Sequence, residues 1–180
     1  MGEIFQIPRR LSRALLYYLA SQGGFTGRDH LLTLFWEEET EPAARRNLRD
    51  TLSRLKSALP DPDLLYIDTS LVGLNFQRAS VDQLQFQELV ERLGRAPWQI
   101  PGDQPLPEPT YQLLKRAIEL WRSPNFMAGA HLPSTPAIDD WLSHTSQHLE
   151  QQYGRLLQRL ADHAYAVEDL GTALDLANAA

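Results

Sequence analysis

Residues 41–59 carry a dense group of side chains that could bind a polyanion. Between Ala43 and Lys56 this segment has five basic residues and one acidic residue, Asp50, which gives it a local charge of +4. Arginine can pair in bidentate fashion with guanine, asparagine can do so with adenine, and both can hold phosphate groups. The residue types therefore suit contact with the major groove of DNA.

These side chains must be positioned by a helix with one buried face. Apolar and small residues recur at spacings of three and four, which places them on a single face. They are Ala44, Leu48, Thr51, Leu52, Leu55 and Leu59. At about 100° per residue, Arg46, Ser53 and Ser57 point the opposite way. A basic flank lies beside them and comprises Arg45, Arg49 and Lys56.

The same pattern has a plainer interpretation. Most amphipathic helices that carry arginines are surface helices whose polar side is simply solvated. The segment alone therefore leaves both interpretations open, and the rest of the chain has to separate them.

Charge distribution is compatible with a basic surface on the first part of the chain. The chain has 180 residues, 43% of them hydrophobic, and a net charge of −6. Residues 1–80 carry ten basic and ten acidic side chains, whereas residues 81–180 carry seven basic and thirteen acidic ones. The acidic excess thus lies in the second part, and a local positive patch in the first remains compatible with the total.

Composition also excludes some classes of protein. Cysteine is absent, which rules out disulfides and thiolate metal sites. No apolar run approaches the ~18 residues needed to span a bilayer. Arg9, Arg10 and Arg13 interrupt the first apolar stretch, so we expect no secretory signal and a cytoplasmic protein without membrane partners.

The first 80 residues predict several short elements around the basic segment. Residues 3–7 alternate weakly and could form a strand, and Pro8 opens a helix that extends to about Ser21. Thr26 and Asp29 have the spacing of a capping box, which predicts a second helix up to about Phe35.

A β-hairpin is predicted after the basic segment. Two apolar runs, residues 64–68 and 71–76, are separated by Thr69 and Ser70. The order helix, helix, basic helix, hairpin is that of a winged helix-turn-helix, whose hairpin reaches the DNA backbone. Thr69, Ser70 and Arg78 could donate to phosphates, although hairpin tips are polar in most proteins.

The second part, residues 81–180, predicts mainly helices. The periodicity indicates helices near 84–93, 109–121, 136–163 and 166–178. Residues 94–109 are rich in proline and glycine and predict an exposed loop. Paired helices with small residues such as Gly154 and Ala161 favour stacked helical hairpins of the tetratricopeptide type. The expected fold is mostly α: a winged helix over 1–80 and a tetratricopeptide-like helical domain over 81–180.

Several motifs resemble the SARP-type bacterial transcriptional activators. In the first part they are Arg-Ala-Leu-Leu-x-Tyr-Leu-Ala at 13–20, the 28–36 helix that ends in Leu-Phe-Trp, and Ala-Arg-Arg-Asn-Leu-Arg-x-x-Leu-Ser-Arg-Leu at 44–55. In the second part they are Val-Asp-x-x-x-Phe at 81–86, Ile-Glu-Leu-Trp at 118–121 and Asn-Phe-Met-Ala-Gly at 125–129. The second part is similar to the bacterial transcriptional activator domain of that family.

The resemblance implies a DNA-binding role and places the groove helix at residues 42–59. It also implies that the chain is the N-terminal fragment of a larger regulator. Arg46, Asn47, Arg49 and Ser53 would then face bases. The full set expected to contact DNA is Arg28, Arg45, Arg46, Asn47, Arg49, Ser53, Arg54, Lys56, Thr69, Ser70 and Arg78.

Other chemistry has little support in the sequence. Asp140, His144 and His148 recur one helical turn apart, a spacing that can hold zinc, but no further ligands are evident, and a solvated role is favoured. A Walker loop is absent, and no catalytic triad or carboxylate pair can be argued from spacing. We therefore expect no enzyme activity, cofactor or metal.

Two functions remain from different classes. The first is a sequence-specific DNA-binding transcription regulator, whose helical domain contacts RNA polymerase, another domain of the same regulator or a second copy of itself. The alternative is a protein-docking scaffold whose winged helix does not bind DNA. Exposure of Arg46 and Arg49 favours the first, and their burial or pairing with the glutamate-rich turn near residue 38 would favour the second.

Overall fold

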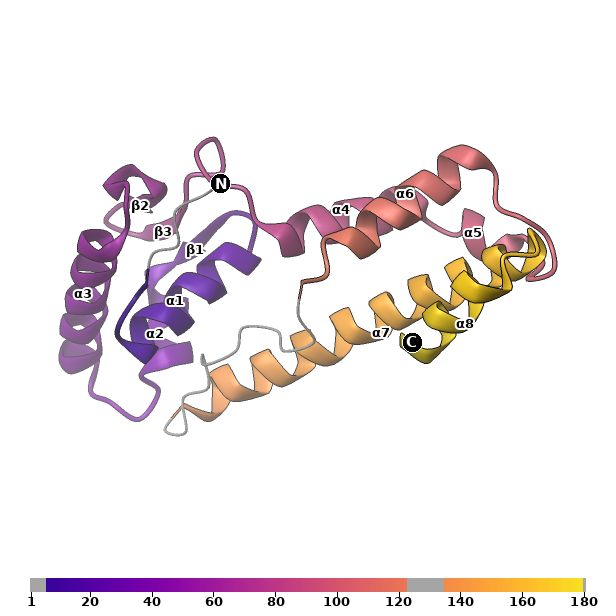
Figure 1. Ribbon diagram of the computed structural model, residues 1–180. Helices are drawn as coiled ribbons and strands as arrows, with labels where there is room; N and C mark the ends of the chain where they lie inside the picture. The colour runs from indigo at the N-terminus through magenta and orange to yellow at the C-terminus, as the bar shows by residue number, and fades with distance from the viewer. Residues whose placement is uncertain (1–5, 123–134, 180) are drawn as a thin grey trace. The chain divides into compact units, whose positions relative to one another are not determined.

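A computed structural model describes residues 6–122 and 135–179 of the chain. The described part is mostly helical and contains one small antiparallel sheet, which confirms the predicted mostly α class (Figure 1). Its elements are α1 (Arg10–Ser21), β1 (Phe25–Gly27), α2 (Arg28–Phe35), α3 (Glu41–Ala58), β2 (Leu65–Ile67), β3 (Leu71–Leu74), α4 (Asp82–Leu93), α5 (Ala96–Gln99), α6 (Glu108–Glu119), α7 (Pro136–Ala166) and α8 (Leu170–Ala179), with a 3₁₀ turn at Pro62–Leu64.

Contacts divide the chain into two compact units. Among the described residues, unit 1 comprises 6–81 and 135–144, and unit 2 comprises 82–122 and 145–179. The first turns of α7 therefore belong to unit 1, and the remainder of that helix belongs to unit 2.

The core of unit 1 lies between its three N-terminal helices and the sheet. Fully buried leucines come from α1 (Leu15, Leu19), α2 (Leu31) and α3 (Leu48, Leu55). The start of α7 adds aromatic contact, because the ring of Trp141 meets that of Tyr18 edge-on at a centroid distance of 4.9 Å. These buried faces follow the three- and four-residue spacing in the sequence.

The sheet of unit 1 confirms the predicted hairpin and adds a third strand. Its strand order is β1-β3-β2, and all pairs are antiparallel. The capping box predicted at residues 26–29 is wrong, because Thr26 pairs with Val72 in the sheet and Gly27 precedes α2 as its N-cap.

Gly73 makes the close packing of this sheet sterically feasible. A Cβ at this position would lie 2.7 Å from Phe25 Cδ1 and 2.8 Å from the Gly24 carbonyl oxygen. Any larger residue would therefore force β1 away from β3.

The N-terminal prediction is partly outside the described residues. Of the strand predicted at 3–7, only Gln6 and Ile7 are described, and they have no regular secondary structure. Ile7 nevertheless lies buried in the core of unit 1. The first helix begins at Arg10 rather than Pro8.

Unit 2 is built from helices. Helices α4 and α6 lie side by side, and α7 and α8 follow one another through a short turn (Figure 1). Trp121 stacks on Tyr153 of α7 with ring centroids 4.4 Å apart and planes only 10° from parallel. The buried apolar residues of this unit are Phe86, Leu93, Leu106, Leu114, Ala117, Leu149, Leu156, Leu157, Leu160, Ala161 and Ala164.

The exposed loop predicted at 94–109 is wrong in part. It contains the short helix α5, and Pro97 and Leu106 within it are buried. Arg159 of α7 is buried too, and it donates through Nε to the Pro97 carbonyl at 2.8 Å and through Nη2 to the Gln104 carbonyl at 3.3 Å. Buried polar groups require such partners, so these bonds hold the segment against α7.

The helices vary in length and in apolar character. None in the described ranges has both the length and the apolar character that crossing a bilayer requires.

Candidate nucleic-acid interface

Helix α3 positions the largest group of candidate residues. Thr40 is its N-cap and Pro42 lies in its first turn, where the missing N–H costs no helical hydrogen bond. Its buried residues are Ala44, Leu48, Thr51, Leu52 and Leu55, which is the face that the sequence predicts.

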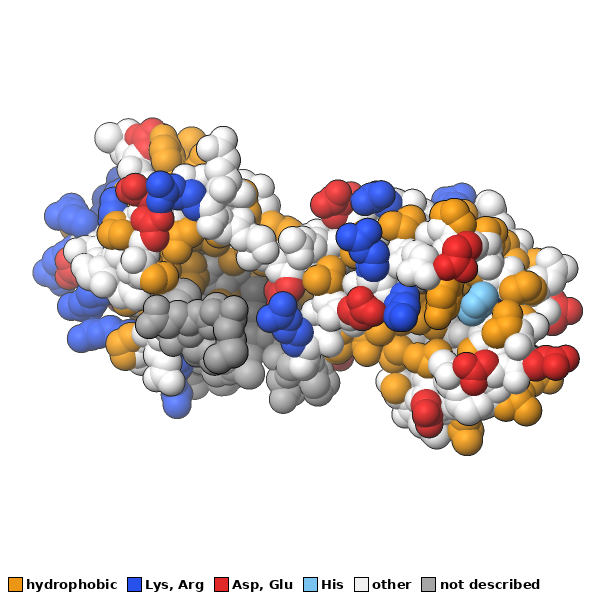
Figure 2. Space-filling view, turned by 45° about the horizontal axis from the view of Figure 1, so that its top comes forward, with side chains coloured by type: hydrophobic (Ala, Val, Ile, Leu, Met, Phe, Trp, Pro, Cys, Tyr) orange, Lys and Arg blue, Asp and Glu red, His pale blue; other side chains and the backbone are white. Residues whose placement is uncertain are grey.

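The face of α3 opposite these leucines is open. Arg46, Arg49 and Ser53 are exposed, and neither guanidinium has a hydrogen-bond or ion-pair partner within residues 6–122 and 135–179. Figure 2 shows a concentration of Lys and Arg side chains on the part of unit 1 where α3 lies. These two arginines therefore retain all their donors for an incoming anion.

Asn47 does not share this open face. It is half-buried, and its Nδ2 donates a 2.6 Å hydrogen bond to Glu39 Oε2 in the turn before α3. The amide predicted to read a base is thus held by the glutamate-rich turn, which occupies one of its two N–H donors.

Arg45 is also engaged with acidic side chains. Its guanidinium lies 2.8 Å from Glu41 Oε1 and 3.3 Å from Asp29 Oδ1. All three side chains are more than half exposed, so the pairs contribute little to stability and can exchange for a phosphate.

The start of α2 lies against the hairpin tip. The backbone N–H of Arg28 donates to the Ser70 carbonyl at 2.9 Å, and Thr69 and Ser70 are exposed beside it. Thr69 Oγ1 donates to Asp68 Oδ1 at 2.7 Å, and hydrogen bonds from Thr69 hold the pKa of Asp68 below its usual range. The structure therefore brings Arg28, Thr69 and Ser70 together, with an ionised carboxylate next to them.

Arg78 lies away from this tip, in the turn that follows β3. It forms an ion pair with Asp61, and it lines a wide hollow of about 840 Å³ with Lys56 of α3. Two exposed aromatic rings line the same hollow: Phe25 and Tyr66, with centroids 4.7 Å apart. Sequence reasoning missed this pair because Phe25 belongs to the unpredicted strand β1.

A further basic residue was missed on the opposite flank of α3. Arg9 and Arg54 line one hollow of about 360 Å³, together with the hydroxyl-bearing residues Ser12, Ser53 and Ser57. Two guanidinium groups and three hydroxyls suit a phosphate group. The signal in the sequence is the run Arg9-Arg10, which interrupts the first apolar stretch.

The remaining motifs give no second site. The Asn-Phe-Met-Ala-Gly motif at 125–129 lies outside the described residues. Among the residues that the structure describes, no three His, Asp or Glu side chains are grouped to hold a metal ion, and this includes Asp140, His144 and His148.

Comparison with known proteins adds no assignment. Neither the family models nor the curated proteins contain a match to this chain.

Proposed function

We propose that this chain is a sequence-specific DNA-binding transcription regulator of the winged helix-turn-helix type. In this proposal α1 and α2 support α3 in the major groove, and the β2–β3 hairpin contacts the neighbouring backbone. The motif resemblance to SARP-type activators supports the same assignment and suggests that unit 2 acts as a tetratricopeptide-like partner-binding domain.

One observation carries the proposal. Arg46 and Arg49 are exposed and unpaired within the described residues, with Arg46 opposite the buried leucine face of α3 and Arg49 on the basic flank beside it. A helix held in this way fixes the positions from which the two guanidinium groups extend, and each keeps the donors that bidentate pairing with guanine requires. The phosphate contacts are then Arg28, Arg45, Arg54 and Lys56, together with Thr69, Ser70 and Arg78 of the hairpin region.

The proposed roles differ from the sequence expectation in two respects. Asn47 is assigned a secondary role because Glu39 holds its amide. Arg9 is added as a phosphate contact because it lines the same hollow as Arg54.

Selection from a random duplex library, followed by fluorescence anisotropy, tests the proposal. Wild-type protein should enrich a defined sequence, and its affinity should fall with a log–log salt slope of about 0.9 per phosphate neutralised. The double variant Arg46→Ala/Arg49→Ala should lose site selection. Arg92→Ala/Arg116→Ala, which removes two exposed arginines of unit 2, is the matched control and should bind normally.

A protein-docking scaffold is the second candidate. The exposed Phe25–Tyr66 pair favours it, because solvent-exposed aromatic pairs are typical of protein interfaces. Full-strength selective binding by the Arg46/Arg49 variant would refute the groove assignment. Absence of any DNA binding by wild-type protein at low salt would favour docking.

A further inference from the structure

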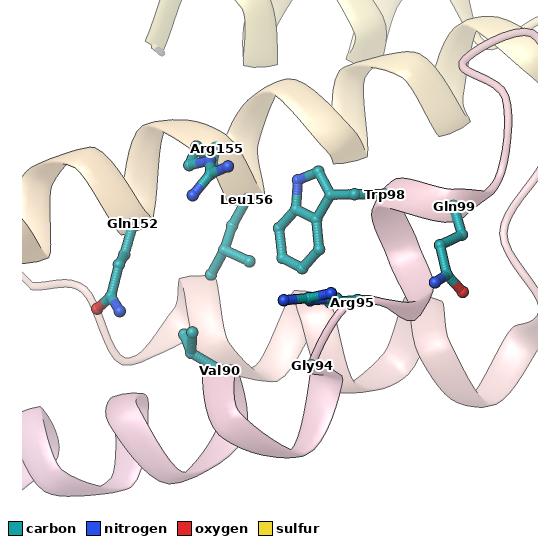
Figure 3. Close-up of a pocket in the computed structure, with 8 residues that line it drawn as sticks. All are labelled: Val90, Gly94, Arg95, Trp98, Gln99, Gln152, Arg155 and Leu156. Carbon is teal, nitrogen blue, oxygen red and sulfur yellow. The ribbon is translucent and has the colours of Figure 1, made fainter.

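Unit 2 contains a pocket that the proposed DNA contact does not use. It has a volume of about 450 Å³ and lies where the end of α4, the short helix α5 and the middle of α7 meet (Figure 3). Its lining residues are Val90, Gly94, Arg95, Trp98, Gln99, Gln152, Arg155 and Leu156. The volume falls within the range of small-molecule sites.

Two arginines and one indole ring dominate the chemistry of this pocket. The Arg155 guanidinium carbon lies 5.9 Å from the Trp98 ring centroid, and Figure 3 shows Arg95 beneath the same ring in this view. None of the lining residues is acidic, although unit 2 has an excess of acidic residues. The pocket is therefore a local basic site with an aromatic wall.

This wall is held in place by buried contacts. Gly94, with φ +53°, makes the turn from α4 to α5 that few other residues adopt. The neighbour of Trp98, Pro97, accepts the 2.8 Å hydrogen bond from buried Arg159. These contacts anchor the backbone of α5, which carries Trp98 with 40% of its surface exposed.

The rest of the lining provides an apolar floor and one unpaired polar atom. Leu156 is buried and lies between Trp98 and Gln152 in Figure 3. Gln152 Oε1 is shielded from solvent and has no hydrogen-bond partner within the described residues. A buried acceptor without a partner is costly.

We propose that this pocket binds a small planar aromatic anion, with a carboxylate or phosphate as its charged group. The aromatic ring stacks on Trp98, and the charged group accepts hydrogen bonds from Arg95 and Arg155. Aromatic faces and guanidinium groups recognise these two features independently, so a ligand that carries both is preferred over one that carries either alone. The proposal does not depend on DNA binding.

Matched pairs of probes test the two features. Calorimetric titration should detect binding of 2-naphthoate and of adenosine monophosphate, and binding about tenfold weaker or absent for their neutral counterparts, 2-naphthylmethanol and adenosine. Naphthoate and the nucleotide distinguish a carboxylate from a phosphate ligand. Inorganic phosphate should bind weakly, because it lacks a ring.

Substitutions inside and outside the pocket test whether the probes bind there. The double variant Arg95→Gln/Arg155→Gln should bind the anionic probes about tenfold more weakly, or weaker still. Arg116→Gln, which replaces an exposed arginine outside the pocket, should leave their affinity unchanged. In ¹H–¹⁵N spectra the indole signal of Trp98, assigned by its loss in Trp98→Phe, should shift on titration while the other three indole signals do not.

Three results would overturn the proposal. One is the absence of binding for both anionic probes at millimolar concentration. Another is equal binding of the neutral counterparts. The third is unchanged affinity in a folded Arg95→Gln/Arg155→Gln variant, with folding checked by circular dichroism.

Discussion

Asn47 of α3 donates a hydrogen bond through Nδ2 to Glu39 Oε2, over a distance of 2.6 Å. The bond couples the basic helix to the acidic turn that precedes it. It occupies one of the two N–H donors of an amide that could pair with adenine, and it holds a carboxylate beside α3. The Asn47–Glu39 hydrogen bond and its carboxylate would therefore oppose DNA binding.

We expect Glu39→Gln to raise DNA affinity about two- to fivefold at low salt. The substitution removes one negative charge that repels phosphates, and exposed charges act within a Debye length of about 10 Å. Anisotropy titrations at low and high salt measure the effect, which should shrink as salt rises. Glu91→Gln on α4 is the charge-matched control, and equal affinities of wild type and Glu39→Gln would contradict this prediction.

Leu48→Ala should lower the free energy of unfolding of unit 1 by about 2–5 kcal/mol. The side chain is fully buried, and its removal loses both transfer energy and packing contacts. Chemical denaturation followed by circular dichroism measures the loss. Arg46→Ala on the open face of the same helix should change stability by no more than about 0.5 kcal/mol, and a comparable loss there would show that this face is not free.

Gly73→Ala should destabilise the sheet by about 1–3 kcal/mol through overpacking. The added methyl group would meet Phe25 and the Gly24 backbone at less than 3 Å. Gly24→Ala is the control, since a Cβ there has no atom within 4 Å. Thermal unfolding of both variants should separate them, and equal midpoints would argue against the tight pairing of β1 with β3.

Stability of unit 2 should fall as the pH drops below 6.5. Burial, together with the charge of Arg159, holds the pKa of His163 below its usual 6.5, although Glu108 opposes the shift. In addition, Nδ1 of His163 accepts a 2.9 Å hydrogen bond from the Leu106 N–H, which protonation of that nitrogen would remove. The unfolded chain therefore binds the proton more readily than the folded chain. As the pH drops, stability falls between the unfolded-state pKa of 6.5 and the lower folded-state pKa.

Urea denaturation between about pH 7.5 and pH 5 tests this dependence. His163→Gln should flatten the pH profile relative to wild type, because it removes the titrating group while other groups still titrate. His148→Gln, an exposed histidine of the same unit, should leave the profile unchanged. Parallel profiles for wild type and His163→Gln would show that His163 contributes nothing to it.

Contacts between distant residues explain where the sequence predictions failed. Strand β1 has only three residues and forms because it pairs with β3, more than forty residues later, so no local pattern indicates it. The segment at 94–109 was predicted as an exposed loop from its proline content. It is held down by Arg159, which lies 62 residues from Pro97 and 55 from Gln104.

The candidate interface was likewise predictable from the sequence only in part. The periodicity of α3 determined which residues of this helix are buried, because a helix repeats every 3.6 residues whatever surrounds it. It could not determine which polar residues remain free. Asp29 and Glu39 engage Arg45 and Asn47 but not Arg46 or Arg49, and that selection depends on where α2 and the acidic turn lie.

The sequence by itself determined the mostly helical class, the buried face of α3, the hairpin and the concentration of positive charge on one helix. These features follow from local spacing and residue type. Tertiary structure alone decided the three-stranded sheet, the ion pair of Arg45 with Asp29, and the pocket around Trp98. Each of these depends on groups far apart in the chain, whose meeting is set by the packing of the whole unit and not by neighbouring residues.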